Sequence, residues 1–99
     1  MIEDLSDIDR VVHEPGRLLI LAVLRAVERA DFLFLLEQTG LTKGNLSSHM
    51  RKLEAVGYVD VEKTYVDRIP RTLYRLTDRG AAAIAEYRAQ MERMLASLS

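Results

Sequence analysis

The sequence predicts a mainly α-helical fold with one small β-hairpin: a three-helix core, the hairpin, and a long C-terminal helix. Two stretches carry this prediction. Residues 42–57 repeat apolar side chains at helical spacing, and residues 58–76 alternate apolar and polar side chains as half-buried strands do. Because the hydrophobic period follows the geometry of each element, the change of period marks a helix followed directly by a hairpin.

The length of the chain, 99 residues, predicts a single domain over residues 1–99. The absence of cysteine excludes disulfides, thiol redox chemistry and thiolate metal sites. No apolar run approaches the roughly 20 residues that span a bilayer. The N-terminus, MIEDLSDIDR, is acidic where a signal peptide would be basic. We therefore expect a soluble cytoplasmic protein with no membrane partner.

Charge is distributed unevenly along the chain. Residues 1–41 carry four basic and eight acidic side chains, residues 42–76 carry seven basic and four acidic ones, and residues 77–99 are balanced. DNA responds to the local field of the face that it meets rather than to the net charge of −1. The pattern favours a basic face within residues 42–76; ordinary surface charge is the alternative.

The N-terminal part is expected to be helical with one break. Residues 1–10 form an acidic segment in which Ile2, Leu5 and Ile8 recur at spacing three, which predicts one or two turns of amphipathic helix. A break follows, and Pro15 suits the first turn of the next helix, which is expected over residues 17–29. That helix is apolar on nearly all sides, so it lies either at the centre of its domain or against a partner chain.

Residues 31–57 are expected to form a helix-turn-helix. Asp31 can cap a short helix over residues 33–39, which Gly40 ends, and Thr42 can cap a second helix that reaches residue 57. The apolar face of this second helix is made of Leu46, Met50, Leu53 and Gly57.

The other face of the 42–57 helix has the chemistry of a major-groove reader. Asparagine can pair two-pronged with adenine and arginine with guanine, and each such pair is worth about 1–3 kcal/mol of discrimination. Serine can serve bases or phosphates. A solvated helix face is the alternative. The expected DNA contacts from this helix are Thr42, Lys43, Asn45, Ser47, Ser48, Arg51 and Lys52.

Strand periodicity predicts a hairpin over residues 58–76, with strands at 58–65 and 72–76 and a loop at 66–71. Pro70 cannot donate to a ladder, so it suits a loop or an edge position. The loop would present arginines near its tip, where they can contact phosphates or enter an A·T-rich minor groove. The alternative is that Asp67 pairs with one of them and nothing else happens. The expected DNA contacts here are Lys63, Arg68 and Arg71.

Thr77 is expected to cap a C-terminal helix over residues 77–98. Its apolar side chains recur at spacings of three and four over two heptads, the pattern of a coiled-coil seam that is too short to be stable alone. Beside the N-terminal helices of a second chain the seam would complete a dimer core; packing on its own domain is the alternative. The expected interface residues are Leu5, Leu21, Ile84, Tyr87, Met91, Met94 and Leu98.

A helix-turn-helix followed by a basic hairpin is the layout of a winged helix-turn-helix, with the hairpin as the wing. The blocks HEPGRLLIL (13–21), DFLFLLEQTGLTKGNLSSHMRKLEAVGYV (31–59) and PRTLYRLTDRG (70–80) resemble compact winged helix-turn-helix transcriptional regulators related to the MarR and ArsR groups. The most specific part is the pattern LT-x-GNLS-x-H. The resemblance implies a homodimeric, sequence-specific DNA-binding regulator, with helix 42–57 in the major groove and wing 63–72 on the backbone or in the minor groove. It implies DNA contacts by Thr42, Asn45, Ser47, Ser48, Arg51, Arg68 and Arg71.

The sequence also departs from these groups. MarR-type regulators are longer, with extra helices that build the dimer and a ligand crevice, and metal-sensing ArsR-type regulators carry a cysteine motif that is absent here. His13 and His49 belong to no close cluster with Asp or Glu, so we expect no metal and no cofactor. A small-molecule effector is left open: apolar space between the first and last helices could hold one, although a packed dimer core explains the same residues.

An enzyme is not expected, because the chain has no Gly-rich phosphate loop, no cysteine nucleophile and no paired histidine and carboxylate. The rival to a DNA-binding regulator is a winged-helix module that binds proteins and has no sequence-specific DNA role. Salt separates the two, because a protein that neutralises phosphates loses affinity as salt rises, with a slope of about −0.9 per phosphate.

Overall fold

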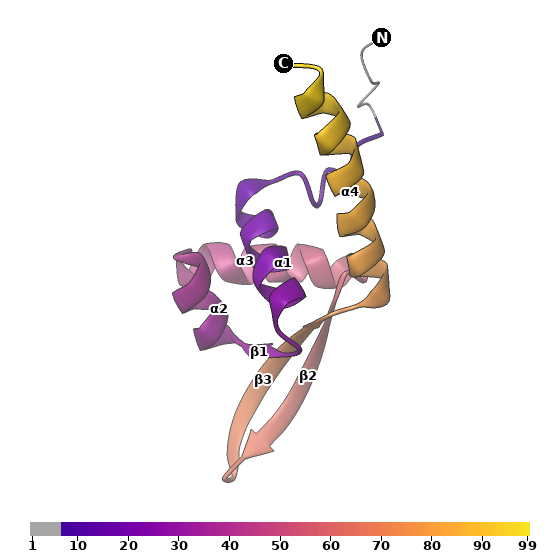
Figure 1. The fold of residues 1–99 in the computed structure, drawn as a ribbon. Coiled ribbons are helices and arrows are strands. Elements are labelled where there is room, and N and C mark those ends of the chain that lie inside the picture. The colour runs from indigo at the N-terminus through magenta and orange to yellow at the C-terminus, as the bar shows by residue number, and fades with distance from the viewer. Residues whose placement is uncertain (1–6) are drawn as a thin grey trace.

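The computed structural model describes residues 7–99 and confirms the winged helix-turn-helix fold (Figure 1). Three helices form the body, a hairpin projects from it, and a long helix follows. The elements in chain order are α1 (Pro15–Ala26), β1 (Ala30–Asp31), α2 (Phe32–Thr39), α3 (Lys43–Ala55), β2 (Val59–Val66), β3 (Ile69–Leu76) and α4 (Asp78–Ala96).

Helix α1 lies at the centre of the body, which is the first of the two positions that its nearly all-round apolar surface allowed. It contacts α2, α3 and β3. Burial of large aliphatic side chains removes apolar surface from water, and this supplies most of the stability of a core of this kind. The most deeply buried side chains are Val12, Ile20, Leu21, Leu24, Leu35, Leu46, Leu53 and Val59.

The expected helix caps are confirmed. The side chain of Asp31 accepts from the N–H of Phe34, that of Thr42 from Asn45, and that of Thr77 from Gly80. Gly40 ends α2 in the left-handed conformation, with φ of 70°, which glycine adopts at little cost. The local signals in the sequence therefore set where α2, α3 and α4 begin.

The C-terminal end of α1 differs from the prediction. The helix ends at Ala26 rather than at residue 29, and Val27 is already extended. The reason is a third strand that was not predicted: Ala30 and Asp31 pair antiparallel with Tyr74 and Leu73 of β3. The chain must be extended before it can join the sheet, so α1 stops early. The sheet order is β1-β3-β2.

The expected loop at residues 66–71 was wrong. The strands continue to Val66 and Ile69 and are joined by a turn of only two residues, Asp67 and Arg68, with φ of 51° and 68°. Positive φ at both positions is what a tight hairpin turn of matching twist requires. Pro70 therefore lies inside β3, opposite Tyr65. It is tolerated because β1 reaches only Leu73 and Tyr74, so no strand pairs with the other edge of β3 at Pro70.

In the described part of residues 1–10, the expected helix is not formed. Ile2 and Leu5 lie outside the described residues, and residues 7–10 form turns. Ile8 and Val12 are buried in the core. The carboxylate of Asp9 accepts from the backbone N–H groups of Val11 and Val12, and it also accepts from the hydroxyl of Tyr58. This segment therefore packs across the body, between α1 and α4.

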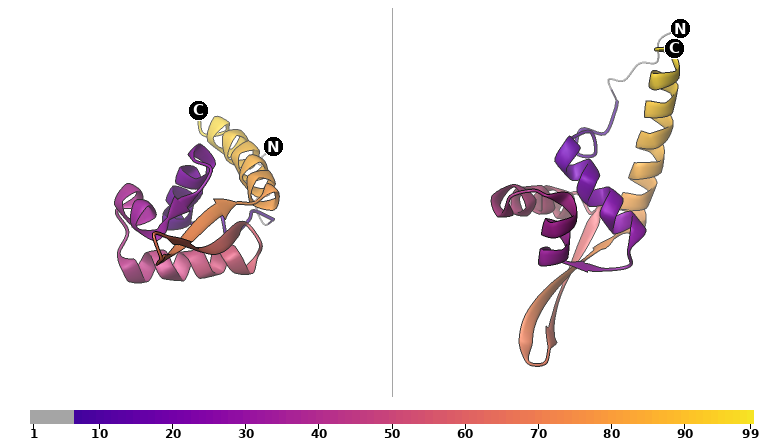
Figure 2. Two further views of the ribbon diagram at one scale, coloured as in Figure 1. Left: turned by 90° about the horizontal axis from the view of Figure 1, so that it is seen from below. Right: turned by 60° about the vertical axis from the view of Figure 1, so that its left-hand side comes forward.

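The wing and α4 point away from each other. The hairpin tip lies at one end of the molecule and the C-terminal half of α4 extends past the body at the other end (Figures 1 and 2). The extents of the chain are 58 × 25 × 21 Å. Within residues 7–99, no helix is both long enough and apolar enough to cross a membrane.

Two glycines give opposite predictions for the same substitution. A side chain at Gly80, buried in the first turn of α4, would overlap the carbonyl oxygen of Tyr58, whereas one at Gly44 of α3 would meet open space. We expect Gly80→Ala to lower the free energy of unfolding by about 1–3 kcal/mol through overpacking. Gly44→Ala, the control, should raise it by about 0.5–1 kcal/mol, because alanine is the better helix former. Urea unfolding of both variants measures this, and equal stabilities would contradict the close approach at Gly80.

Candidate nucleic-acid interface

Helix α3 presents the polar face that the sequence predicted. Leu46, Met50 and Leu53 are buried against the body. The residues expected to contact DNA lie on the remaining surface: Thr42, Lys43, Asn45, Arg51 and Lys52 are exposed, and Ser47 and Ser48 are half-buried. Gly44 and Ala55, which are also exposed, add little bulk to this face. The backbone of α3 can therefore approach a flat or concave partner closely.

The wing joins α3 along one face of the sheet. Because side chains alternate across a strand, the cross-strand pairs Val61–Tyr74 and Lys63–Thr72 share one face, and Glu62–Leu73 and Thr64–Arg71 share the other. The first face borders a hollow of ≈ 320 Å³ against α3. The hollow is lined by Ser47, Met50, Arg51, Glu54, Val61, Lys63, Thr72 and Tyr74. Three predicted DNA contacts, Ser47, Arg51 and Lys63, are thus brought together.

Tyr74 and Glu54 belong to this hollow and were not predicted from the sequence. Burial raises the pKa of Tyr74, and the charge of Glu54 adds to the rise. The phenol therefore stays neutral at physiological pH, so it does not add to the repulsion of an anionic partner. The place of Tyr74 depends on strand register, which the sequence pattern did not supply, and Glu54 comes from the last turn of α3.

The arginines of the wing divide between the two faces. Arg71 lies 3.8 Å from Asp31 and Arg75 lies 2.7 Å from Asp60, both as ion pairs on the face turned away from α3. Arg68 is exposed in the turn and forms no ion pair within residues 7–99. The wing tip therefore offers one arginine, and not the two that the expected loop would have presented.

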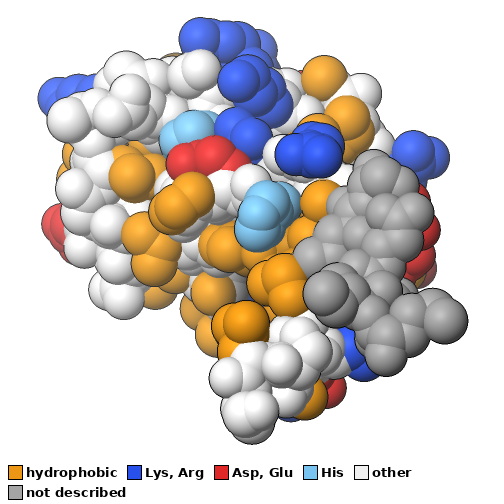
Figure 3. Space-filling view, turned by 90° about the horizontal axis from the view of Figure 1, so that it is seen from above, with side chains coloured by type: hydrophobic (Ala, Val, Ile, Leu, Met, Phe, Trp, Pro, Cys, Tyr) orange, Lys and Arg blue, Asp and Glu red, His pale blue; other side chains and the backbone are white. Residues whose placement is uncertain are grey.

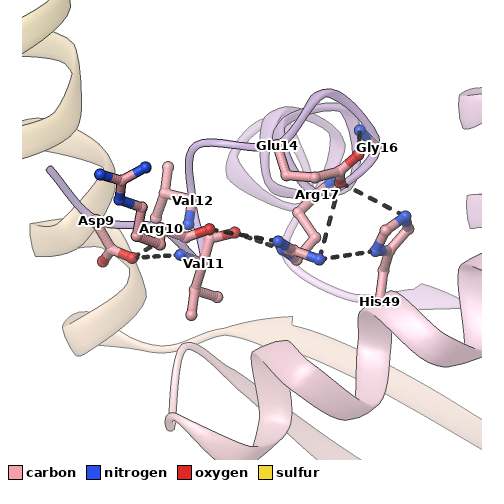
Figure 4. A network of polar contacts seen from close by, with 8 residues as sticks. All are labelled: Asp9, Arg10, Val11, Val12, Glu14, Gly16, Arg17 and His49. Carbon is pink, nitrogen blue, oxygen red and sulfur yellow. Dashed lines mark hydrogen bonds and ion pairs between the residues drawn. The ribbon is translucent and has the colours of Figure 1, made fainter.

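The position of α3 against α1 is set by a buried arginine (Figure 4). The guanidinium of Arg17 donates to the carbonyl oxygens of Val11 and Arg10 and lies 3.1 Å from Nδ1 of His49 on α3. Arg17 is only 8% exposed. A buried charge is costly unless it is fully hydrogen-bonded, so these contacts hold α3 and the segment before α1 in one arrangement.

Glu14 closes the same network from the other side. Its carboxylate caps α1 by accepting from the N–H groups of Gly16 and Arg17, and it lies 3.5 Å from Nε2 of His49. A guanidinium can only donate, so Nδ1 of His49 accepts and the ring proton is placed on Nε2, facing Glu14. A side chain at Gly16 would crowd this imidazole, which explains the glycine.

The charge state of Glu14 follows from these contacts. Burial alone would raise the pKa of Glu14, but hydrogen bonds from the backbone of Arg17 and Gly16, together with electrostatic attraction to His49 and Arg17, bring it below its ordinary value. The network was not recognised from the sequence. Its one visible signal was a cation at the start of an otherwise apolar helix, beside Pro15-Gly16.

The expected dimer residues are placed unevenly. Leu21 is 1% exposed in the core of its own chain, and Tyr87 is 9% exposed and bonded to Nδ1 of His13 at 2.7 Å. Burial raises the pKa of Tyr87. Ile84, Met91 and Met94 are half-buried, and Leu98 is 76% exposed. Leu5 lies outside the described residues. Seen from the end that carries α4, hydrophobic side chains gather across the middle of the surface (Figure 3).

The space beside α4 is less apolar than expected for an effector pocket. A hollow of ≈ 220 Å³ between the segment before α1 and α4 is lined by Asp7, Asp9, Tyr58, Ala83, Glu86, Tyr87 and Gln90. The hydrogen bond to Asp9, and then burial, raise the pKa of Tyr58. Over residues 7–99, no group of three or more His, Cys, Asp or Glu side chains could hold a metal ion.

These features define a winged helix DNA-binding domain: the chain belongs to this family, whose model matches residues 17–95. It is 37% identical over 78 residues to an uncharacterized protein from Methanocaldococcus jannaschii, covering 79% of this chain and 85% of that protein. A transcriptional regulator homologue from Pyrococcus horikoshii is 32% identical, with a TM-score of 0.88 over 96% of both chains.

The fold is also shared with a transcriptional repressor, CouR, whose structure contains a DNA duplex. That repressor is 23% identical, with a TM-score of 0.76 over 95% of this chain and 66% of its own. Membership in the MarR or ArsR group within the winged-helix regulators stays a prediction.

The lowered pKa of Glu14 predicts a pH-dependent contribution to stability. Because the folded state favours the carboxylate, this contribution is complete above the ordinary pKa of 4.5 and is lost as pH falls through the lower folded value. We expect Glu14→Gln to be less stable than the wild type above about pH 4.5, and the gap to narrow below it. Urea unfolding across this range measures the gap. Glu37→Gln, at an exposed position, is the control, and parallel profiles for wild type and Glu14→Gln would contradict the role of the carboxylate.

Proposed function

We propose that this protein is a sequence-specific DNA-binding transcriptional regulator that acts as a homodimer, with α3 in the major groove and the wing against the flanking DNA. The observation that carries the proposal is the division of cations. Those on the outer face of α3, on the α3 side of the wing and at its tip form no ion pair within residues 7–99: Lys43, Arg51, Lys52, Lys63 and Arg68. The arginines on the opposite face of the wing are neutralised by carboxylates.

Unpaired cations on one face are what a phosphate backbone requires. Binding releases counterions from DNA only where the protein supplies charges that are not already compensated. We leave Arg71 out of the proposed DNA contacts because its charge is already compensated by Asp31. This ion pair ties the wing to the start of α2. The remaining predicted contacts, from Thr42 to Arg68, stay in the proposal. The DNA duplex bound by the structurally similar repressor agrees with it.

The homodimer is proposed from α4. Its C-terminal half extends past the body, with Leu95 58% and Leu98 76% exposed beside the half-buried Met91 and Met94. Pairing of this surface between two copies would bury it and would relate the two α3 helices by a two-fold axis. Such a dimer meets two half-sites about one helical turn, roughly 34–36 Å, apart. Leu21 is left out of the proposed interface because its own core already covers it.

The first experiment is selection of bound sequences from a random duplex library with the purified protein at physiological salt. An enriched inverted repeat would support both sequence reading and the two-fold dimer. Weak binding without enrichment would contradict the proposal and would favour the winged-helix module that binds proteins. The selected duplex then serves as the probe for the variants below.

Arg51 and Arg75 form a matched pair for testing the contact face. Arg51 is exposed on α3 and forms no ion pair within residues 7–99, whereas Arg75 is bound to Asp60 on the far face of the wing. We expect Arg51→Ala to weaken binding to the selected site by about 1–3 kcal/mol, and to random duplex by much less. Arg75→Ala should change neither. Fluorescence anisotropy measures both affinities; an equal loss on both duplexes would make Arg51 a phosphate contact rather than a base reader.

The dimer surface is tested by adding charge to it. Met91→Lys together with Met94→Lys would place two ammonium groups in the proposed seam, where burial of unpaired charge is costly, so we expect monomers. Ala82→Lys together with Ala85→Lys adds the same charge at exposed positions of α4 and should leave the dimer intact. Light scattering on a sizing column gives the mass of each. A dimer that persists in the methionine variant would rule out this surface.

A further inference from the structure

Helix α3 carries one acidic side chain among its cations. Within residues 43–55, Glu54 is the only aspartate or glutamate, and it lies in the last turn of the helix. It is exposed and forms no ion pair within residues 7–99. A carboxylate at this end of a helix also meets the negative pole of the helix dipole, which is unfavourable. The described contacts therefore give Glu54 no role in stabilising the fold.

The side chain of Glu54 is turned toward the wing. Ser47, Arg51 and Glu54 follow one another at spacings of four and three, so they form one stripe along α3. All three line the hollow of ≈ 320 Å³ between α3 and the wing, together with Lys63 from β2. Tyr74, whose pKa is raised by burial and then by the charge of Glu54, lines the same hollow. A carboxylate thus lies on the surface that we propose contacts DNA.

The chemistry of a carboxylate restricts what Glu54 can bind on DNA. An ionised carboxylate only accepts hydrogen bonds, and it repels phosphates. In the major groove, guanine presents acceptors at N7 and O6, and thymine presents an acceptor at O4. Adenine offers a donor at N6 beside an acceptor at N7, whereas cytosine offers the N4 amino group alone. Cytosine is therefore the base that a glutamate can bind without repulsion.

We propose that Glu54 is a specificity-determining residue of α3 that accepts a hydrogen bond from N4 of one cytosine in each half-site. This inference rests on the proposed function and adds a base reader on the wing side of α3. Residues three apart on a helix are neighbours, with Cβ atoms about 5–6 Å apart, and successive bases of one strand are about 3.4 Å apart along the duplex. Arg51 and Glu54 can therefore reach neighbouring base pairs, so a guanine read by Arg51 should lie beside the cytosine read by Glu54.

Selection from the random duplex library tests the proposal by a change of base preference. Glutamine pairs two-pronged with adenine at N6 and N7, so Glu54→Gln should change the selected base at one position of each half-site from cytosine to adenine. Glu54→Ala should lose the preference at that position and keep the rest of the repeat. Glu62→Gln removes the same charge from an acid that pairs with Arg29 on the face of the wing turned away from α3. It is the control and should select the wild-type repeat.

The stability of the variants shows whether Glu54 has a structural role. Because its side chain is exposed and lies at the unfavourable end of the helix dipole, both Glu54 variants should unfold at or slightly above the temperature of the wild type. A change of selected base in proteins of unchanged stability then reports recognition and not folding.

A modified duplex tests the hydrogen bond itself. N4-methylcytosine still pairs with guanine, but its methyl group occupies the position from which the N4 hydrogen would reach Glu54. Hydrogen bonds to charged groups are stronger than neutral ones, so this modification at the selected cytosine should weaken binding of the wild type about tenfold. It should leave the affinity of Glu54→Ala unchanged. The same modification at a cytosine outside the repeat is the control. An unchanged affinity of the wild type would overturn the proposal.

Other results would overturn the inference and leave the proposed function standing. Tighter binding of both Glu54 variants to selected and random duplexes alike would place the carboxylate beside the phosphate backbone. An unchanged selected sequence and affinity would place it in solvent. A change confined to the position that Arg51→Ala also alters would make Glu54 a positioning residue for Arg51 and not a reader. The absence of any enriched sequence with the wild type would overturn both the inference and the proposed function.

Discussion

The buried guanidinium of Arg17 is the contact on which the position of α3 depends. From the first turn of α1 it reaches the carbonyl oxygens of Arg10 and Val11 in the preceding segment and, 32 residues further along the chain, His49 on α3. No buried side-chain nitrogen or oxygen among the described residues lacks a hydrogen-bond partner. A shift of α3 along its axis would separate His49 from Arg17 and leave a buried guanidinium N–H without its acceptor. Helix α3 is therefore held against the body by these polar contacts and by the buried side chains of Leu46, Met50 and Leu53.

This arrangement separates the buried face of α3 from the face that we propose contacts DNA. His49 and the aliphatic side chains face the body, while Asn45 and Arg51 face outward. The same separation operates in the wing, where strand alternation turns Lys63 toward α3 and Arg71 toward Asp31. The exposed ion pairs contribute little to stability, since surface pairs are worth about 0–1 kcal/mol. Their larger effect is on the field of the protein: they cancel positive charge on one face and leave it on the other.

The two ends of the elongated molecule carry different exposed side chains. At one end the C-terminal half of α4 carries apolar side chains that the rest of the chain does not cover. At the other end the hairpin tip carries an arginine between apolar pairs. The α3 surface lies between them. A two-fold axis through α4 would set both the spacing of the α3 helices and the reach of the wings, so dimer geometry and DNA geometry would be linked by a single element.

Local chemistry in the sequence determined the helices and their ends. Asp31, Thr42 and Thr77 cap helices as expected because a cap needs only a side-chain oxygen and a backbone N–H within three residues. The apolar face of α3 and its polar outer face followed from the 3.6-residue period, which is also a local property of the sequence. The membership of the chain in the winged helix family agrees with the fold predicted from these local patterns.

Tertiary structure alone decided the features that depend on residues distant in sequence. Strand β1 exists because Ala30 and Asp31 find an open edge of β3, and that pairing ended α1 early. The register of β2 on β3 closed the hairpin at Asp67 and Arg68, kept Pro70 in a strand and gave Arg71 to Asp31. Strand pairing and ion pairing are long-range, and a period of two describes a strand without naming its partner. The sequence by itself therefore determined the polar outer face of α3, whereas the fold decided which arginines of the wing form ion pairs.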